Sequence, residues 1–203
     1  MFAYCGNGPV NRIDSTGTRF RNNFATISSG GGGRLSDYVI YYYHPESDKN
    51  LKDPAQKNHS ASDSSFVGVS SFDELTAAIN SVPQGIDDVY IYMHSDAEKF
   101  SFYYAQYYSA TNIEESINEI DISGDIYLFS CKGGRGKLAS TLASETGCTV
   151  VAPVYKVSFG EGYARCGWWS YYTEKGIYGD CTWYSFYPNG SVEQFSYYIV
   201  GTR

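Results

Sequence analysis

The sequence lacks the features of several common protein classes. Within its 203 residues no apolar run approaches the roughly 20 residues that span a bilayer, and the first residues lack the basic-then-apolar layout of a signal peptide. There are 15 basic residues against 22 acidic ones, and the net charge of −7 repels phosphate backbones. We therefore expect a soluble chain that binds neither membranes nor nucleic acid, and whose export would depend on a segment outside it.

Cysteine and histidine are also scarce. Five cysteines without a CxxC pair and three histidines do not form the pattern of a zinc ribbon or of a disulfide-stapled miniprotein. The glycines and basic residues of 132–137, KGGRGK, lack the G-x-x-x-x-G-K-[ST] spacing of a phosphate-binding loop. The sequence therefore predicts no metal site and no cofactor. Cys5 and Cys148 are expected to be structural, whereas Cys166 and Cys181 either form a disulfide or remain two buried thiols.

Aromatic residues, in contrast, make up 17% of the chain and favour half-buried strands. Short strands are expected over residues 38–43, 88–93, 125–129 and 149–152, and the long segment 44–65 reads as a loop. Helices are expected over 72–80, from Thr111 or Asn112 to Ile120, and over 137–145 with Gly147 at the end. This alternation predicts an α/β fold, a mainly parallel sheet with helices on both faces.

The two ends of the chain differ from this central pattern. From residue 154 onward an antiparallel, aromatic-rich β segment is expected, with a hairpin of residues 182–187 and 191–200 around the turn Pro188-Asn189-Gly190. Near the start, SSGGGG at residues 28–33 has the composition of a linker. We therefore expect two parts, a short segment over 1–33 and the main domain over 34–203.

The turn-rich opening resembles the end of the core of Rhs/YD-repeat proteins, whose signature runs Tyr-x-x-Asn-Asn-Pro-Val-Asn-x-x-Asp-Pro-x-Gly. Gly8 and Ser15 depart from that pattern, and the matching residues are Tyr4, Asn7, Pro9, Val10, Asn11, Asp14 and Gly17. In that family this region precedes a variable C-terminal effector. The resemblance implies that residues 34–203 are the effector of a bacterial polymorphic toxin, delivered into a target cell as part of a larger secreted protein and countered by a cognate immunity protein.

Two residues at predicted strand ends could carry chemistry. His94 follows the strand 88–93 and Cys131 follows the strand 125–129, and the carboxyl ends of neighbouring parallel strands meet at the edge of the sheet where sites form. A thiolate is a nucleophile, and a nearby imidazole lowers the thiol pKa or protonates the leaving group. Gly133, Gly134 and Gly136 are expected to leave room for a substrate backbone.

The other two histidines are weaker candidates. His44 also ends a predicted strand and is a fallback base. His59 lies in the serine-rich segment and is expected to be solvated.

This layout resembles the caspase-like cysteine peptidases, the group of caspases, clostripain, gingipains and toxin self-processing domains, over residues 38–153. Those proteins place a histidine at the end of one strand and a cysteine at the end of the next, with a hairpin and a helix between. By position, Cys131 would be the nucleophile, His94 the general base or acid, and the N–H groups of Ser95 and Cys131 the oxyanion donors. Ser95 replaces the usual glycine, and Ser130 stands where many members have Asp or Ala.

The expected activity is thiol-dependent hydrolysis of a peptide bond in a target-cell protein or in the toxin's own precursor. Two alternatives stay open. In the first, the domain is an inactive caspase-like module that only binds a partner. In the second, it is another Cys/His acyl-transfer enzyme such as a deamidase or a transglutaminase.

Overall fold

The computed structural model describes residues 36–160, 163–167, 170–173, 176–178 and 182–195. The chain divides into two units, Met1–Gly33 and Arg34–Arg203. The first unit lies outside the described residues, so the Rhs-like segment and its linker remain predictions.

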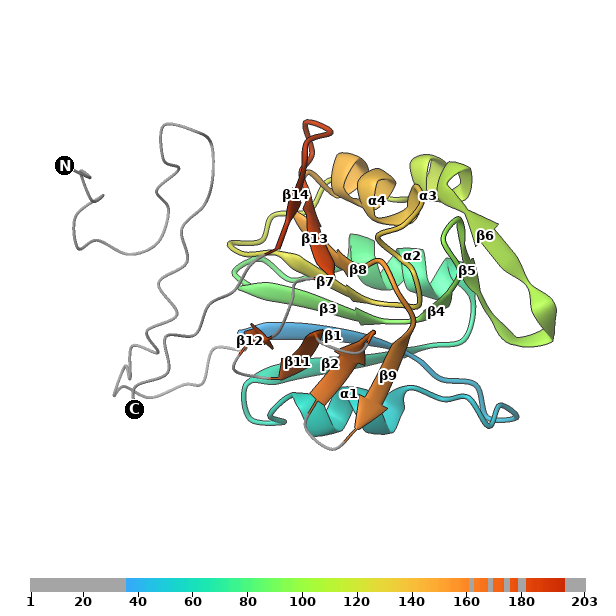
Figure 1. Cartoon of the computed structure of the whole chain (residues 1–203). Coiled ribbons are helices and arrows are strands. Elements are labelled where there is room, and N and C mark those ends of the chain that lie inside the picture. Colours follow the sequence, from blue (N-terminus) through green and yellow to red (C-terminus); the bar gives the residue numbers. More distant parts are fainter. Residues whose placement is uncertain (1–35, 161–162, 168–169, 174–175, 179–181, 196–203) are drawn as a thin grey trace, which may run out of the picture. The chain divides into compact units, whose positions relative to one another are not determined.

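A seven-stranded sheet forms the centre of the second unit (Figure 1), in the order β14-β13-β8-β7-β3-β1-β2. Five of its strands are parallel neighbours: β2 (Ser64–Val69), β1 (Asp37–Tyr42), β3 (Asp88–Tyr92), β7 (Ile126–Phe129) and β8 (Val150–Pro153). The hairpin of β13 (Trp183–Phe186) and β14 (Val192–Gln194) adds two antiparallel strands beside β8. The predicted α/β fold with a mainly parallel sheet is confirmed.

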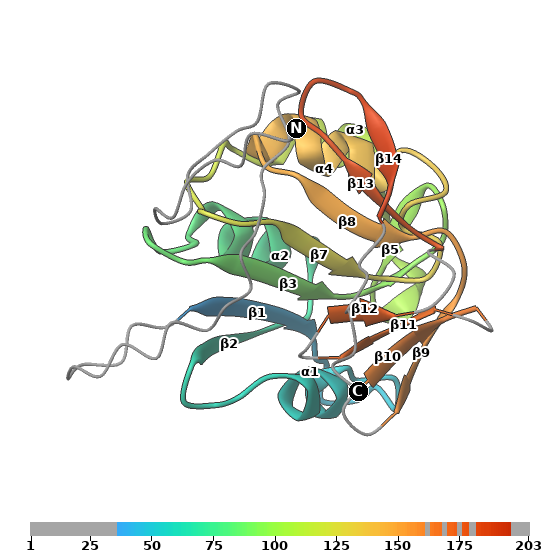
Figure 2. The ribbon, with the colours of Figure 1, turned by 60° about the vertical axis from the view of Figure 1, so that its left-hand side comes forward.

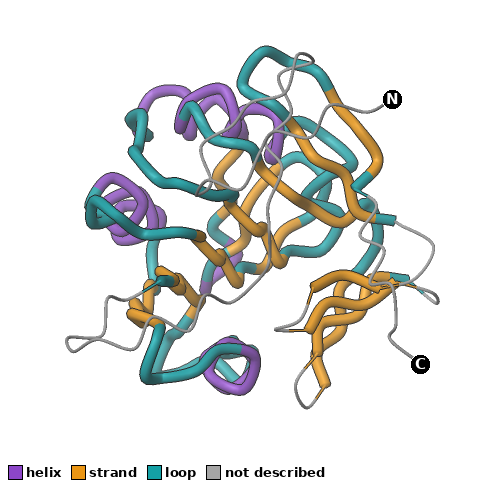
Figure 3. The backbone as a smooth tube through the Cα atoms, turned by 90° about the vertical axis from the view of Figure 1, so that its left-hand side faces the viewer, coloured by secondary structure: helices purple, strands orange, loops and turns teal. Residues whose placement is uncertain are grey.

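Helices cover both faces of this sheet, as Figures 1 and 2 show. Helices α2 (Phe72–Asn80), α3 (Ala110–Ser116) and α4 (Leu138–Thr146) lie on one face. On the other face lie α1 (Lys52–Asn58) and an antiparallel sheet of β9 (Val157–Gly160), β10 (Tyr163–Cys166), β11 (Ser170–Thr173) and β12 (Gly176–Tyr178). Figure 3 shows α1 beside this small sheet.

A second antiparallel sheet lies between β3 and α3 in the chain. It contains β4 (His94–Ser95), β5 (Lys99–Ser101) and β6 (Tyr107–Ser109). A single turn of 3-10 helix, Tyr103–Ala105, connects β5 to β6. The hairpin expected in this region is therefore present as a three-stranded sheet.

Local capping signals set the helix boundaries. The Ser71 hydroxyl accepts the Glu74 N–H at 3.3 Å, and the Glu74 carboxylate accepts the Ser70 N–H at 2.6 Å and the Ser70 hydroxyl at 2.8 Å. These hydrogen bonds to Ser70 lower the pKa of Glu74. Helix α4 ends at Gly147, whose φ of 70° is the left-handed conformation that glycine adopts without strain.

Helix α3 differs from its prediction at both ends. Its N-cap is Ser109, whose N–H donates to the Asn112 side chain at 2.9 Å, so the expected cap at Thr111 or Asn112 is wrong. The helix ends at Ser116, and Ile117 is already extended with a ψ of 136°. Ile113 and Ile117 are nevertheless both buried, because a turn of helix and the extended residue after it face the same core.

The segment 44–65 is not the continuous loop that its polar composition predicts. It contains α1 and the start of β2. Asp53 and Pro54 in the first turn of α1 are signals for a helix start, but the helix buries only Ala55 and Asn58, so it has no apolar stripe to reveal it. The edge strand β2 is likewise only partly buried, and its burial does not alternate from residue to residue.

Alternate residues of the central strands build an aromatic layer against the antiparallel sheet β9–β12. The rings of Tyr90 and Tyr127 stack at 5.1 Å between centroids, and those of Tyr92 and Phe129 at 4.6 Å. Tyr172 from β11 packs edge-on against Phe129 at 4.8 Å. This layer joins β3 and β7, the two strands whose ends carry the candidate site.

No helix of the described segments is long and apolar enough to cross a membrane.

Candidate functional site

His94 and Cys131 follow two neighbouring parallel strands. β3 pairs with β7 through Tyr92 and Phe129, and the Met93 N–H donates to the Phe129 carbonyl at 3.2 Å beyond the last pair. The Ser95 hydroxyl then donates to the Cys131 carbonyl at 2.8 Å. The two strand ends are therefore tied together within one residue of each candidate side chain.

The His94 imidazole is oriented by the chain's own backbone. Its Nε2 lies 2.6 Å from the carbonyl oxygen of Lys49, in the loop after β1. Because a carbonyl oxygen only accepts hydrogen bonds, Nε2 carries the proton and Nδ1 holds the free lone pair of the neutral ring. The edge-on ring of Tyr42, 5.3 Å away between centroids, supports the imidazole from the side.

The Cys131 thiol is half-buried, and its hydrogen bond goes to strand β9 and not to His94. Sγ lies 3.8 Å from the Val157 carbonyl oxygen in β9, a long contact with a weak donor. Within the described residues no hydrogen bond joins this thiol to the His94 imidazole. Proton transfer between the two groups therefore requires the thiol to leave the Val157 carbonyl.

The backbone after β7 turns sharply at the cysteine. Lys132 has a φ of 59°, and its N–H donates to the Tyr155 carbonyl at 2.9 Å. In the described part of the chain the Cys131 N–H has no acceptor. An amide without a partner beside a thiol can stabilise an oxyanion. Ser95, the second expected donor, lies in β4 opposite Phe100. Its hydroxyl donates to the Cys131 carbonyl, a contact that the sequence did not predict.

The glycines after Cys131 allow the chain to pack against itself. A Cβ on Gly136 would overlap the backbone carbonyl of Ala97, and one on Gly134 would lie 2.9 Å from the Ala152 carbonyl oxygen. A Cβ on Gly133 would overlap the side-chain oxygen of Ser130. The expectation that these glycines leave room for a substrate is therefore wrong, because the chain's own atoms occupy that space.

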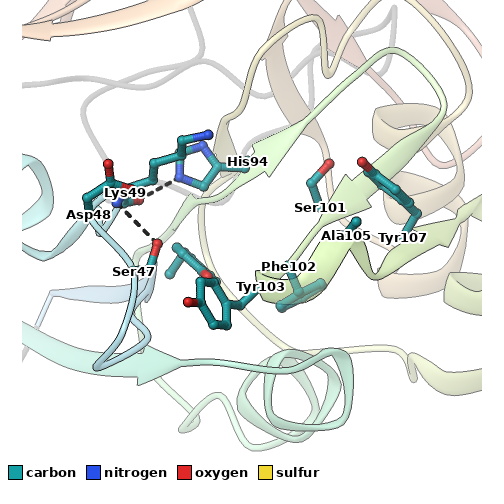
Figure 4. A pocket seen from close by; sticks show the side chains of 10 residues that line it. Ser47, Asp48, Lys49, His94, Ser101, Phe102, Tyr103, Ala105 and Tyr107 are labelled. Atoms are coloured by element: carbon teal, nitrogen blue, oxygen red, sulfur yellow. Dashed lines mark hydrogen bonds between the residues drawn. The ribbon is translucent and has the colours of Figure 1, made fainter.

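A pocket of about 470 Å³ opens beside His94 (Figure 4). The segment around Asp48 and Lys49 forms one side, and Tyr103 and Tyr107 stand across from it. Aromatic rings dominate a lining that also carries hydroxyl and charged groups. The lining residues are Tyr42, Ser47, Asp48, Lys49, His94, Ser101, Phe102, Tyr103, Ala105 and Tyr107.

The two remaining histidines have structural surroundings. The His44 ring stacks on Tyr103 at 4.2 Å, and its Nδ1 accepts the Glu46 N–H at 3.2 Å. His59 is only 7% exposed, so the expectation that it is solvated is wrong. Its Nε2 lies 2.9 Å from the Tyr92 hydroxyl, which anchors the end of α1 to the central sheet. No local sequence signal marks this contact, because its two residues are 33 positions apart.

The described cysteines differ in accessibility. Cys148 and Cys166 are buried free thiols, and burial raises the pKa of Cys166. Cys131 is half-buried, so it is the described thiol that solvent reaches most readily. Cys5 and Cys181 lie outside the described residues.

Across the described segments, no group of three His, Cys, Asp or Glu side chains is placed to hold a metal ion.

No protein-family model matches the chain, and a search of curated proteins finds no match.

Proposed function

We propose that residues 34–203 are a caspase-like cysteine peptidase effector of an Rhs-type toxin. The observation that carries this proposal is the placement of His94 and Cys131 after the neighbouring parallel strands β3 and β7, joined by the Ser95 hydrogen bond to the Cys131 carbonyl. The sheet β4–β6 and helix α3 lie between them in the chain. This arrangement supports the proposal, because the resemblance to caspase-like peptidases implies a hairpin and a helix between the two strands.

In the proposed reaction the Cys131 thiol loses its proton to Nδ1 of His94. The thiolate attacks the carbonyl carbon of a peptide bond, so that a C–S bond forms and the carbonyl oxygen becomes an oxyanion that the Cys131 N–H stabilises. The C–N bond then breaks, and His94 returns the proton to the leaving amine. Water hydrolyses the thioester and regenerates the thiol.

Two observations at His94 support this assignment of roles. The Lys49 carbonyl holds the proton on Nε2 and leaves Nδ1 as the base. The pocket that His94 lines is a concave space in which a side chain of the substrate can lie while its scissile bond approaches the imidazole. The protein substrate is either a target-cell protein or the precursor of the toxin itself.

One observation favours a second candidate, an inactive module that binds a partner protein. The Cys131 thiol donates to the Val157 carbonyl and has no hydrogen bond to an imidazole in the described residues. The two candidates differ in whether the chemistry of Cys131 is required.

The deciding experiment is inducible expression of residues 34–203 inside bacterial cells. Cys131→Ala and His94→Ala should each abolish growth inhibition, because the two groups act as one unit. His44→Ala is the matched control, since it removes an imidazole that stacks beside the same pocket. Growth inhibition that persists in Cys131→Ala would favour the binding module.

Two chemical measurements separate the peptidase from the other acyl-transfer enzymes. Iodoacetamide should modify Cys131 faster than Cys148 or Cys166, because both of those thiols are buried. New protein N-termini in the intoxicated cells, found by mass spectrometry, would identify peptide-bond cleavage. Deamidated or cross-linked glutamine without new N-termini would contradict it.

A further inference from the structure

The loop between β1 and α1, residues 43–51, presents the Lys49 carbonyl to His94 without any helix or strand of its own. Glu46, Asp48 and Lys49 are exposed, so apolar burial does not fix this part of the loop. Its path must be set by hydrogen bonds. The distance of 2.6 Å between the Lys49 oxygen and Nε2 therefore depends on whatever holds the loop closed.

The Asn50 side chain closes this loop. Its Oδ1 accepts the His44 N–H at 2.7 Å, while Nδ2 donates to the His44 carbonyl at 3.0 Å and to the Ser47 carbonyl at 2.8 Å. One amide group thus satisfies three backbone groups across six residues of the loop. The Leu51 N–H, next in the chain, donates to the Tyr42 carbonyl at 2.9 Å and fixes the base of the loop to the end of β1.

We infer that Asn50 is a positioning residue that holds the Lys49 carbonyl against Nε2 of His94, and through it sets which ring nitrogen is the base. Lys49 is bonded directly to Asn50, so the hydrogen bonds of Asn50 fix the peptide unit that carries this carbonyl. The catalytic consequence rests on the proposed peptidase function, whereas the structural link between Asn50 and His94 does not. The same three hydrogen bonds also shape the wall of the pocket at Ser47 and Asp48.

Asn50→Ala tests the inference, with Asn80→Ala as a matched control. Asn80 also bridges backbone groups, since its Nδ2 donates to the Ser116 carbonyl at 2.9 Å and its Oδ1 accepts the Asn118 N–H at 2.9 Å, but that bridge joins α2 to the end of α3. Both variants lose a side-chain amide that bridges two or more backbone groups. Only Asn50→Ala should affect His94.

The first readout is the Nε2-bound proton of His94 in NMR spectra of uniformly nitrogen-15-labelled protein, assigned by comparison with His94→Ala. In the unmodified domain the hydrogen bond to the Lys49 carbonyl slows the exchange of this proton, so its signal should be visible. Asn50→Ala should lose the signal and Asn80→Ala should keep it. A protected Nε2 proton in Asn50→Ala would overturn the inference, and this readout needs no peptidase activity.

The second readout is growth inhibition. Because a small misplacement of a catalytic group can lower a rate by about a hundredfold, Asn50→Ala should need about ten to a hundred times more expression than the unmodified domain for the same inhibition. Full inhibition by Asn50→Ala at the unmodified expression level would contradict the inference. If Cys131→Ala inhibits growth as well as the unmodified domain, the peptidase function fails while the NMR result still decides the role of Asn50.

A thermal melt separates positioning from unfolding. If Asn50→Ala does not fold, Asn50→Asp takes its place, because an aspartate keeps the acceptor for the His44 N–H and removes only the two donated hydrogen bonds. The folded Asn50→Asp domain should also lose the Nε2 proton signal. Retention of that signal would overturn the inference.

Discussion

Replacing His59 with alanine removes a buried polar contact between the end of α1 and the central sheet. The His59 Nε2 lies 2.9 Å from the Tyr92 hydroxyl, and its ring packs on Tyr90 with 4.1 Å between centroids. Tyr92 is fully buried, so water cannot replace the lost partner. The change therefore leaves the buried Tyr92 hydroxyl without its His59 partner and opens a void in the aromatic layer.

The expected loss of stability is the sum of two effects. An orphaned buried polar group costs about 1–3 kcal/mol. The void left by a mid-sized buried side chain costs about 2–3 kcal/mol, at the lower end of large-to-alanine changes. The free energy of unfolding should fall by about 4 kcal/mol, which for a domain of this size lowers Tm by about 8–16 °C.

Thermal unfolding followed by circular dichroism measures this change. His44→Ala, in the half-buried stack on Tyr103, should lower the free energy of unfolding by no more than about 1 kcal/mol. Adding Tyr92→Phe to His59→Ala should restore about 1 kcal/mol, because no hydroxyl is then left without a partner. A His59→Ala domain that melts within about 2 °C of the unmodified one would refute the buried hydrogen bond.

Two further predictions concern the turn after Cys131 and the aromatic layer. Gly136→Ala should destabilise the domain by about 2–3 kcal/mol in urea unfolding, because its Cβ overlaps the Ala97 carbonyl. Gly190→Ala, which meets no atom within 4 Å, should lose only about 1 kcal/mol to its left-handed backbone, and an equal loss in both would contradict the overlap. Burial raises the pKa of Tyr90 and Tyr92 well above 10.0, so their contribution to stability is complete below pH 10 and is lost as the pH rises further. Their tyrosinate absorbance should appear only as the protein unfolds, and their titration in the native state would refute this.

The sequence predicted the elements whose signals are local. Helix α2 begins after Ser71 because a serine hydroxyl satisfies the Glu74 N–H within the same turn, and α4 ends at Gly147 because glycine adopts a positive φ freely. The alternation of such helices with buried strands was sufficient to predict a mainly parallel sheet, since parallel strands require crossover connections.

Elements with few buried apolar residues escaped prediction. Helix α1 buries only Ala55 and Asn58, so its sequence resembles a polar loop. The sequence did predict an antiparallel segment after residue 154, but not the bounds of strands β9–β12, because these strands are short and their pairing depends on residues brought together by the hairpins. The burial of His59 depends on the same face of the sheet, because its ring packs on Tyr90, which also contacts Tyr172 of β11.

For the candidate site, the sequence by itself determined that His94 and Cys131 each follow a buried strand, because short runs of β-branched, apolar and aromatic residues mark both strands. Tertiary structure decided which groups contact and orient their side chains. The group that orients His94 is a backbone carbonyl 45 residues away, and every residue type carries such a carbonyl. Its use at Lys49 is visible only once the loop closed by Asn50 lies against the end of β3.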